Sequence, residues 1–489
     1  MSELPRKKLT DIIQKNGKSL CRDPIRCEGL LRDLCPGHPR EISVIIAALH
    51  QQVGTDLISP PHGISLEHHL HQLSRRMYEN LGICDRFAWW AVISWALALR
   101  VIDRESEVKP PRELEDIKIS LRVKGKASSH TQPGSLIVAP DGSGHVSSIG
   151  DALKKASPHT QIYLRPGRYQ GNLTVTTPLQ IIGEGRPSEI VIEGINGPCL
   201  TLANSGCLVH GVTLDQKGVP SELPSSALDI IRGACVVEDC RILTPGIGVA
   251  IRGGRADPIL RRCSILSTGE YGVVMERGKG LVESCRIEGA VRGISIRGKT
   301  SALFRGLAIL HGYIGIEIRD HGSAIVDACE ITDQSYAGIT IQESSNPEIR
   351  GCTISRAQFG VEVTDRGRGI LDQCTIQGCA QGVLISERGD PTICACTLRH
   401  NQFGIRVTSD GRGKIQNSDI SENEFAGISI KEKGNPVISG CRVTKNGDIG
   451  IWVQKSGLGT LEGNDLRGNR KGNLSIDEGS QVHQRKNLL

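Results

Sequence analysis

Aromatic residues are scarce in this sequence, and the scarcity argues against a compact enzyme domain. Only 3% of the 489 residues are Phe, Tyr or Trp, whereas 58 residues are Gly. A chain of this length does not build a single compact core, so we expect several domains or a repeat architecture. Abundant Gly without Pro enrichment, together with many Val and Ile residues, predicts short strands joined by tight turns.

Clustered basic charge and long apolar runs are also missing. The net charge of +6 is spread over the chain without a basic run. Because nucleic-acid binding normally requires a basic stripe, we expect no nucleic-acid partner. Residues 1–17 lack the apolar core of a signal peptide, and residues 87–99 are too short an apolar stretch to span a bilayer. We therefore expect a soluble cytoplasmic protein without a membrane partner, whose 17 Cys residues are mostly free thiols.

Helical periodicity marks residues 1–104. Apolar residues recur at spacings of three and four along five segments, with representatives Leu9, Leu30, Ile45, Leu70 and Trp90. The pattern predicts an α-helical bundle domain of about five helices. Residues 105–133 are polar and charged, and we expect them to form a linker.

Residues 134–489 contain an internal repeat. The motif Gly-Ile/Val-X-Ile/Val recurs every 21–24 residues. Its Gly residues are Gly248, Gly272, Gly293, Gly315, Gly338, Gly360, Gly382, Gly404, Gly427 and Gly450. A constant period of this length indicates a solenoid.

A second string of small residues lies between the Gly motifs. Its members are Cys240, Cys263, Cys285, Gly306, Cys329, Cys352, Cys374, Cys396, Ser418, Cys441 and Asn464. Aliphatic residues stand three before and two after each member, with Leu303 and Ala308 flanking Gly306. Each unit of about 22 residues thus offers three short strands and no helix. We predict an all-β right-handed parallel β-helix of about 14 coils, closed at one end by a capping helix near residues 146–156.

Two groups of segments resemble known families. IVAPDGSG at residues 137–144, IYLRPGRY at 162–169 and IIGEG at 181–185 resemble the opening of pectin-lyase-like β-helix proteins, pectin methylesterases included. The later repeats are similar to the β-helix of F-box β-helix proteins and to the carbohydrate-binding and sugar-hydrolase repeat family. Residues 19–33 and 90–99 resemble a bacterial helical adaptor module. These resemblances imply the fold and a bacterial source, and no F-box is recognisable.

The Cys residues do not form a metal motif. Column members lie 21–23 residues apart or more, whereas zinc knuckles place them two to four residues apart. Cys21, Cys27, Cys35 and His38 match no familiar knuckle either. We expect an interior stack of thiols, no metal site and no cofactor.

Catalytic motifs of the resembling families are absent as well. The sequence lacks the acidic motifs of polygalacturonases and alginate epimerases and the later motifs of pectin methylesterases. His210, His311 and His321 have no matching acid cluster in the sequence. We expect no catalytic residues; an active enzyme with this sequence would be carbohydrate-active, of the polysaccharide lyase or glycoside hydrolase type.

A binding face is predicted on the Gly-Ile-X-Ile strands, because residue X points outward when its two neighbours point inward. Acidic residues form a second column at the end of the same strands. The predicted binding residues are Glu317, Asp320, Glu343, Glu362, Asp365, Leu384, Glu387, Arg406 and Trp452. Leu384 and Trp452 would be exposed apolar anchors. A solvated sheet face is the alternative.

Six aromatic residues precede the repeat Gly residues. They are Tyr271, Tyr313, Tyr336, Phe359, Phe403 and Phe425. They either stack at a corner of the coil or face a ligand. The functional hypothesis is a non-enzymatic scaffold that presents the β-helix to a protein or peptide partner, with the helical module as adaptor. The alternative is a β-helix that binds or processes a polysaccharide.

Overall fold

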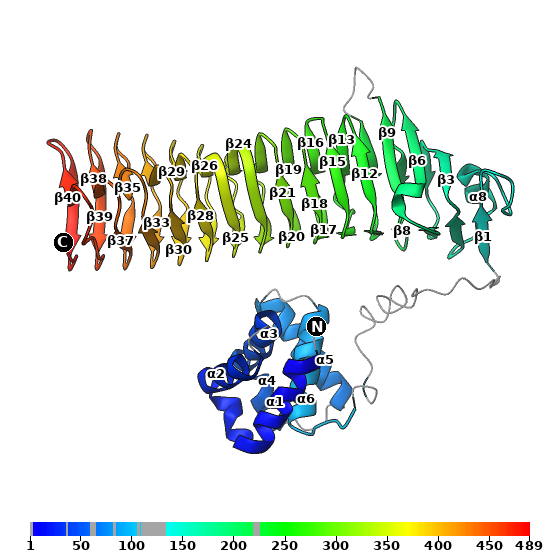
Figure 1. Ribbon diagram of the computed structural model, residues 1–489, viewed down its shortest axis with the longest axis horizontal. Helices are drawn as coiled ribbons and strands as arrows, with labels where there is room; N and C mark the ends of the chain where they lie inside the picture. The colour runs from blue at the N-terminus through cyan, green and yellow to red at the C-terminus, as the bar shows by residue number, and fades with distance from the viewer. Residues whose placement is uncertain are drawn as a thin grey trace. The chain divides into compact units, whose positions relative to one another are not determined.

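The chain divides into two compact units, Met1–His130 and Thr131–Leu489. The computed structural model describes residues 3–35, 38–58, 65–81, 85–104, 108, 134–218 and 225–489 (Figure 1). Apart from residue 108, the linker expected at residues 105–133 lies outside these ranges. None of the helices within them is long and apolar enough to cross a membrane.

The described part of the first unit is helical. It contains α1 (Glu3–Asn16), the 3₁₀ turn η1 (Lys18–Arg22), α2 (Pro24–Leu34), α3 (Pro39–His50), α4 (Val53–Ile58), α5 (Leu66–Leu81) and α6 (Asp85–Ala98). The short helix α4 was not expected from the sequence. Its single apolar turn is too short to show a periodic face.

The core of the helical unit is centred on α6. Trp95 is fully buried, and its indole N–H donates to the backbone oxygen of Ile45 at 2.9 Å. Arg6 lies over the Trp90 ring and donates from Nε to Ser94 Oγ at 3.0 Å. Cys21, Cys27 and Cys35 belong to this core, and burial raises the pKa of Cys27 to about 12. These thiols fill apolar space.

The second unit is a parallel β-solenoid (Figure 1). Sheet A takes one strand from each of 16 turns. Its strands are β1 (Ser135–Val138), β2 (Gln161–Leu164), β5 (Gln180–Gly183), β8 (Leu208–His210), β11 (Val236–Glu238), β14 (Ile259–Arg261), β17 (Gly278–Glu283), β20 (Thr300–Arg305), β23 (Ala324–Asp327), β25 (Glu348–Arg350), β27 (Ile370–Asp372), β30 (Thr392–Cys394), β33 (Lys414–Gln416), β36 (Val437–Ser439), β39 (Leu458–Glu462) and β41 (Gln481–Arg485). The expected 14 coils were too few.

Sheet B carries the other two sides of the coil as two rows of parallel strands. Row B1 is β3 (Gly167–Gln170), β6 (Ile190–Ile195), β9 (Thr213–Lys217), β12 (Arg241–Thr244), β15 (Ser264–Ser267), β18 (Arg286–Glu288), β21 (Ala308–Leu310), β28 (Thr375–Gln377), β31 (Thr397–Arg399), β34 (Asp419–Ser421) and β37 (Arg442–Thr444). Row B2 is β4 (Leu173–Val175), β7 (Leu200–Leu202), β10 (Ser226–Ile230), β13 (Ile247–Ile251), β16 (Tyr271–Met275), β19 (Arg292–Arg297), β22 (Ile314–Arg319), β29 (Gln381–Ile385), β32 (Phe403–Val407), β35 (Ile428–Ile430), β38 (Ile449–Val453) and β40 (Gly472–Ile476). The long strands β24 (Glu330–Ile341) and β26 (Thr353–Val363) run through both rows.

Aliphatic columns fill the interior, as the repeat predicts. Ile393, for example, is fully buried and lies in register with Leu371 and Ile415. One coil departs from the predicted register. Phe304, in place of Leu303, occupies the interior column between Val282 and Val326. Leu307 and Ile309 accordingly replace Gly306 and Ala308 at the next positions, so larger side chains fill the two places where the repeat predicted small ones.

Two corners of the coil hold stacked polar groups. Each column thiol lies over main-chain oxygens; Cys396 Sγ, for example, donates to Cys394 O at 3.2 Å. A second stack at the corner between B1 and B2 was not predicted. Here the backbone N–H groups of Asn401, Asn423 and Asn446 each donate to the Asn side chain one coil further on, at 3.1 Å from Asn401 to Asn423 Oδ1 and ending at Asn469. Both stacks satisfy backbone groups that the turns leave inside the coil.

The helix α8 (Ile149–Lys155) lies beside β1 at the N-terminal end of the solenoid (Figure 1). Ser148 caps it by accepting from the backbone N–H of Asp151 at 3.1 Å. Ile149 and Ala152 are buried against the core of the solenoid. The helix therefore covers apolar surface that an open coil would expose.

Candidate functional site

The predicted binding column lies on the outer side of row B2. Backbone register aligns its members across successive coils, in the order Ser295, Glu317, Thr340, Glu362, Leu384, Arg406, Ser429 and Trp452. The residues on either side of each member point into the core; Ile316 and Ile318, for example, are fully buried. We call this column together with the six aromatic residues that precede the repeat Gly residues the B2 strip.

Several members of the column are covered by their neighbours. Glu317 and Thr340 are each only 2% exposed. Leu384 and Trp452, expected as exposed anchors, are half-buried. The expectation that Leu384 and Trp452 are exposed was therefore wrong, because alternation fixes which way a side chain points and not which neighbouring side chains cover it.

Glu317 is neutralised by its surroundings. Its carboxylate accepts from Arg292 Nε at 2.8 Å and from Ser295 Oγ at 2.8 Å, and Arg319 Nε lies 3.7 Å away. Arg292 also stacks on Tyr271, with 5.5 Å between the guanidinium carbon and the ring centroid. The Glu317 carboxylate is therefore already hydrogen-bonded and ion-paired to side chains of the protein.

Glu362 is half-buried, and its carboxylate accepts hydrogen bonds from one phenol hydroxyl. Both of its oxygens accept from the hydroxyl of Tyr336, at 3.0 and 3.1 Å. Burial raises the pKa of Glu362 above its usual value, against the effect of this hydrogen bond. Burial together with the carboxylate also raises the pKa of Tyr336 to about 12, so the phenol stays protonated as a donor.

The aromatic residues form two stacked groups. Tyr313 and Tyr336 lie parallel with centroids 5.0 Å apart, and Tyr336 meets Phe359 edge-on at 5.2 Å. Phe403 and Phe425 form the second group, also at 5.2 Å. Tyr313 is 46% exposed and Phe425 is 38% exposed, so each group presents one accessible ring.

Arg292 interrupts the aromatic row next to Tyr271, and Gln381 interrupts it again at a later coil, between Phe359 and Phe403. The preceding corner of that coil consists of Gly378, Cys379 and Ala380. These small residues leave a shallow pocket of about 300 Å³ against the next two coils. Its larger lining residues are His400, Gln402, Glu422 and Glu424.

The predicted acidic column lies at the corner between row B2 and sheet A. Its members Asp320, Glu343, Asp365, Glu387 and Glu432 all have positive φ. Three of the five carboxylates accept hydrogen bonds from the turn of the preceding coil. Glu343 Oε2 accepts from the backbone N–H of Asp320 at 3.0 Å, and Glu387 and Glu432 accept from Thr364 at 2.8 Å and Thr408 at 2.6 Å. These contacts give the column a role in the turns.

Arg406 differs from the other charged members of the strip. Its guanidinium lies over the Phe403 ring at 3.9 Å from the centroid. Burial lowers the pKa of Arg406, and the charge of Glu432 opposes this effect. The buried Nε has no hydrogen-bond partner, and within the described ranges the guanidinium makes no ion pair.

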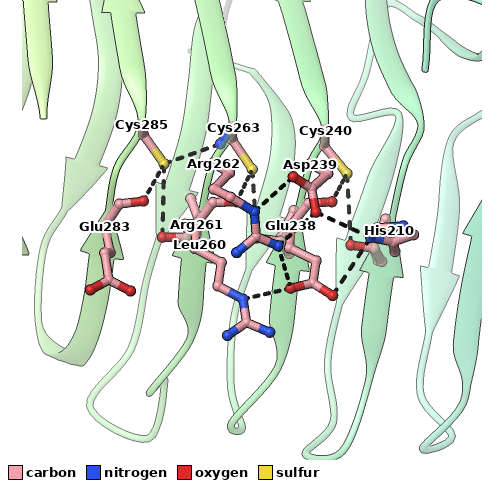
Figure 2. A network of polar contacts seen from close by, with 12 residues as sticks. His210, Glu238, Asp239, Cys240, Leu260, Arg261, Arg262, Cys263, Glu283 and Cys285 are labelled. Atoms are coloured by element: carbon pink, nitrogen blue, oxygen red, sulfur yellow. Dashed lines mark hydrogen bonds and ion pairs between the residues drawn. The ribbon is translucent and has the colours of Figure 1, made fainter. Parts of the chain in front are cut away.

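A second polar cluster lies on the outer side of sheet A (Figure 2). His210 Nδ1 lies 3.5 Å from both Glu238 Oε1 and Asp239 Oδ2. The expectation that His210 has no acid cluster was wrong, because residues 28 apart in the sequence stand on neighbouring coils. His311 likewise lies 3.1 Å from Glu288.

Two arginines form ion pairs with the carboxylates of this cluster (Figure 2). Glu238 Oε2 accepts from Arg261 Nε at 2.5 Å and from Arg262 at 3.1 Å. Burial favours a raised pKa for Glu238, but hydrogen bonds from His210 and Arg261 and the nearby positive charges hold it at about 2. The ligand atoms of His210, Glu238 and Asp239 are close enough to share a cation. Two guanidiniums already neutralise the two carboxylates, so the donor set does not fit a metal ion.

The alternation of charge continues along sheet A. Register aligns Glu238, Arg261, Glu283, Arg305, Asp327, Arg350 and Asp372 on successive strands. Arg305 Nε donates to Asp327 at 2.7 Å. We call these residues the sheet A charge column. Most of its charges are paired within the molecule.

Comparison with known proteins supports the fold of the second unit. The family model described as "Right handed beta helix region" matches residues 292–412 and 381–489. The second unit is thus a right-handed parallel β-helix.

Two curated relatives come from Arabidopsis thaliana. A probable pectinesterase/pectinesterase inhibitor 61 is 25% identical over 31% of this chain and 28% of its own length. A probable pectinesterase 56 is 26% identical over 34% of this chain and 62% of its own length. The chain thus spans less than two thirds of either relative.

The chain also aligns with two solved structures. The catalytic unit of an α-1,3-glucanase from Streptomyces thermodiastaticus aligns at a TM-score of 0.47 with 14% identity, over 73% of this chain and 71% of its own. A mannuronan C-5 epimerase module from Azotobacter vinelandii aligns at 0.35 with 16% identity, over 69% and 92%.

Proposed function

We propose that the β-helix binds an extended polysaccharide along the B2 strip. The observation that carries this proposal is the aromatic row: its accessible rings Tyr313 and Phe425 pack on Tyr336 and Phe403, and these two rings contact Glu362 and Arg406 of the column. Aromatic rings offer large apolar area at little conformational cost, and a regular sheet loses little order on binding. The partial sequence similarity to pectinesterases supports a carbohydrate ligand.

A protein or peptide partner on the same strip has weaker support. That hypothesis depended on Leu384 and Trp452 as exposed anchors, and both are half-buried. Trp452 also donates from its indole nitrogen to Asp477 at 3.2 Å. The outward-facing polar groups of the strip suit a hydroxyl-rich ligand better than they suit an apolar protein interface.

We propose binding and not catalysis, because the carboxylates of the strip already form contacts with other side chains of the protein. Glu317 is held by Arg292, and both oxygens of Glu362 are held by Tyr336. A catalytic acid or base must reach the reacting proton within hydrogen-bond distance. In this conformation these two groups reach protein atoms instead.

The test is oligosaccharide binding by the full chain, first on a glycan array and then by titration calorimetry. The double variant Tyr313→Ala/Phe425→Ala should weaken binding roughly tenfold, since each ring contributes about 0.5–1.5 kcal/mol. The control is Tyr163→Ala, which removes a half-buried Tyr from the outer side of sheet A. Failure of every polysaccharide to bind, or equal loss in the control, would refute the proposal.

A further inference from the structure

Arg406 is a cation that the molecule buries without an anion. Its side chain is half-buried, and its Nε has no hydrogen-bond acceptor among the residues that the structure describes. The planar group is held in place by the Phe403 ring at 3.9 Å. Leaving a charged donor unpaired and partly desolvated costs free energy that an anionic ligand would recover.

Other arginines of the strip and of sheet A are engaged. Arg292 donates to Glu317, Arg297 donates to the hydroxyl of Tyr271 at 2.5 Å, and Arg261 donates to Glu238. Arg406 differs because the adjacent positions of its column are Leu384 on one coil and Ser429 on the next. Neither side chain offers a carboxylate.

The carboxylate whose charge acts on Arg406 is that of Glu432, and it is already engaged in other contacts. Glu432 accepts from Thr408 at 2.6 Å and from Ser409 at 3.3 Å, and it lies 3.2 Å from Lys431. These contacts lower the pKa of Glu432, with the Thr408 hydrogen bond the largest cause. It therefore stays ionised and attached to its own turn.

Resting on the function proposed above, we propose that Arg406 binds a carboxylate of the polysaccharide, so that the ligand is built from acidic sugar units. A guanidinium pairs with a carboxylate through two parallel N–H donors. The Phe403 ring beneath it keeps this fork oriented before the ligand arrives. The accessible ring of Phe425 belongs to the same aromatic group as Phe403 and would contact the apolar face of a neighbouring sugar.

The experiment compares two probes of equal length, an oligogalacturonate and its fully methyl-esterified form, titrated into the full chain. The wild type should bind the acid form at least about tenfold more tightly, because charge-assisted hydrogen bonds are the stronger ones. Arg406→Ala should remove most of that preference and leave affinity for the ester nearly unchanged. Arg406→Lys should restore only part of it, because an ammonium group lacks the fork.

The matched control is Arg399→Ala, which removes an exposed Arg one strand earlier, on row B1. It makes the same change in net charge, so any loss shared by both variants reflects general attraction and contradicts the proposal. Equal binding of both probes with no effect of Arg406→Ala would overturn the acidic ligand and leave polysaccharide binding standing. Binding of neither probe would overturn the acidic ligand, and the glycan array described above then decides whether polysaccharide binding stands.

Discussion

The sheet A charge column and the B2 strip are two outer surfaces built on one interior, and they use polar residues in opposite ways. On sheet A an acid on one strand faces a base on the next, as Glu238 and Arg261 do at 2.5 Å. On the B2 strip Glu317 is paired with Arg292, but Glu362 accepts from the hydroxyl of Tyr336, and Arg406 lies over Phe403 with no ion pair among the described residues. Paired charges stabilise the coil, whereas an unpaired one is available to a ligand.

The largest expected effect removes both surfaces together. Ile393 is fully buried beneath sheet A, and the mutation Ile393→Asp would place an unpaired carboxylate in the core. We expect a loss of roughly 3–5 kcal/mol in the free energy of unfolding of the β-helix, measured by denaturant titration of the full chain. Thr392→Asp alters the half-exposed neighbour and should cost far less. Equal effects of the two variants would show that the register is wrong.

A smaller effect separates the paired surface from the unpaired one. The Glu238 side chain is 5% exposed and ion-paired to Arg261, which is itself 17% exposed. Glu238→Gln should lower the free energy of unfolding by about 3 kcal/mol, because it leaves a partly buried guanidinium without its anion. Glu283→Gln is the matched control on the same column, since Glu283 makes no ion pair among the described residues, and should cost under about 0.5 kcal/mol.

The pKa of Glu238 gives this comparison a pH dependence. Because the folded state holds the pKa at about 2, below the ordinary value of 4.5, the stabilisation is complete above pH 4.5. It is lost as the pH falls from 4.5 toward 2. The wild type should therefore lose stability faster than Glu238→Gln over that interval. Parallel curves for the two proteins would contradict the assigned pairing.

The smallest expected effect concerns two thiols that lie two residues apart. Cys394 is partly exposed in the outer column of sheet A, whereas Cys396 is 1% exposed in the internal stack. A hydrogen bond with Cys374, together with burial, raises the pKa of Cys396. Alkylation of the native protein followed by mass spectrometry should label Cys394 and leave Cys396 and the other column thiols unlabelled until denaturation. Early labelling of Cys396 would mean that the stack opens.

Much of the fold could be predicted because its core repeats. The Gly-Ile-X-Ile motif and the Cys column mark coils from Gly248 onward, and the structure places the corresponding aliphatics inside. The first coils lack both signals, so the number of coils was underestimated. The register at Phe304 is shifted by one residue, and the sequence did not reveal the shift because the neighbouring Leu303 is equally apolar.

The candidate site was harder to predict because it depends on contacts between columns. Period-2 alternation placed Glu317 and Thr340 on the outer side, but their burial comes from side chains that lean across from other positions. The cluster around His210 joins residues 28 apart, a spacing outside the regular repeat of 21–24. The spacing of Asn401, Asn423, Asn446 and Asn469 was a signal that could have revealed the second polar stack.

The most direct test of polysaccharide binding on the B2 strip is hydroxyl-radical footprinting of the full chain with and without saturating oligogalacturonate. Side-chain oxidation reports solvent access at individual residues. We predict that Tyr313 and Phe425 are protected by the oligosaccharide, while Tyr163 and Cys394 on sheet A are oxidised at unchanged rates. Protection on sheet A with Tyr313 and Phe425 unchanged would contradict the account.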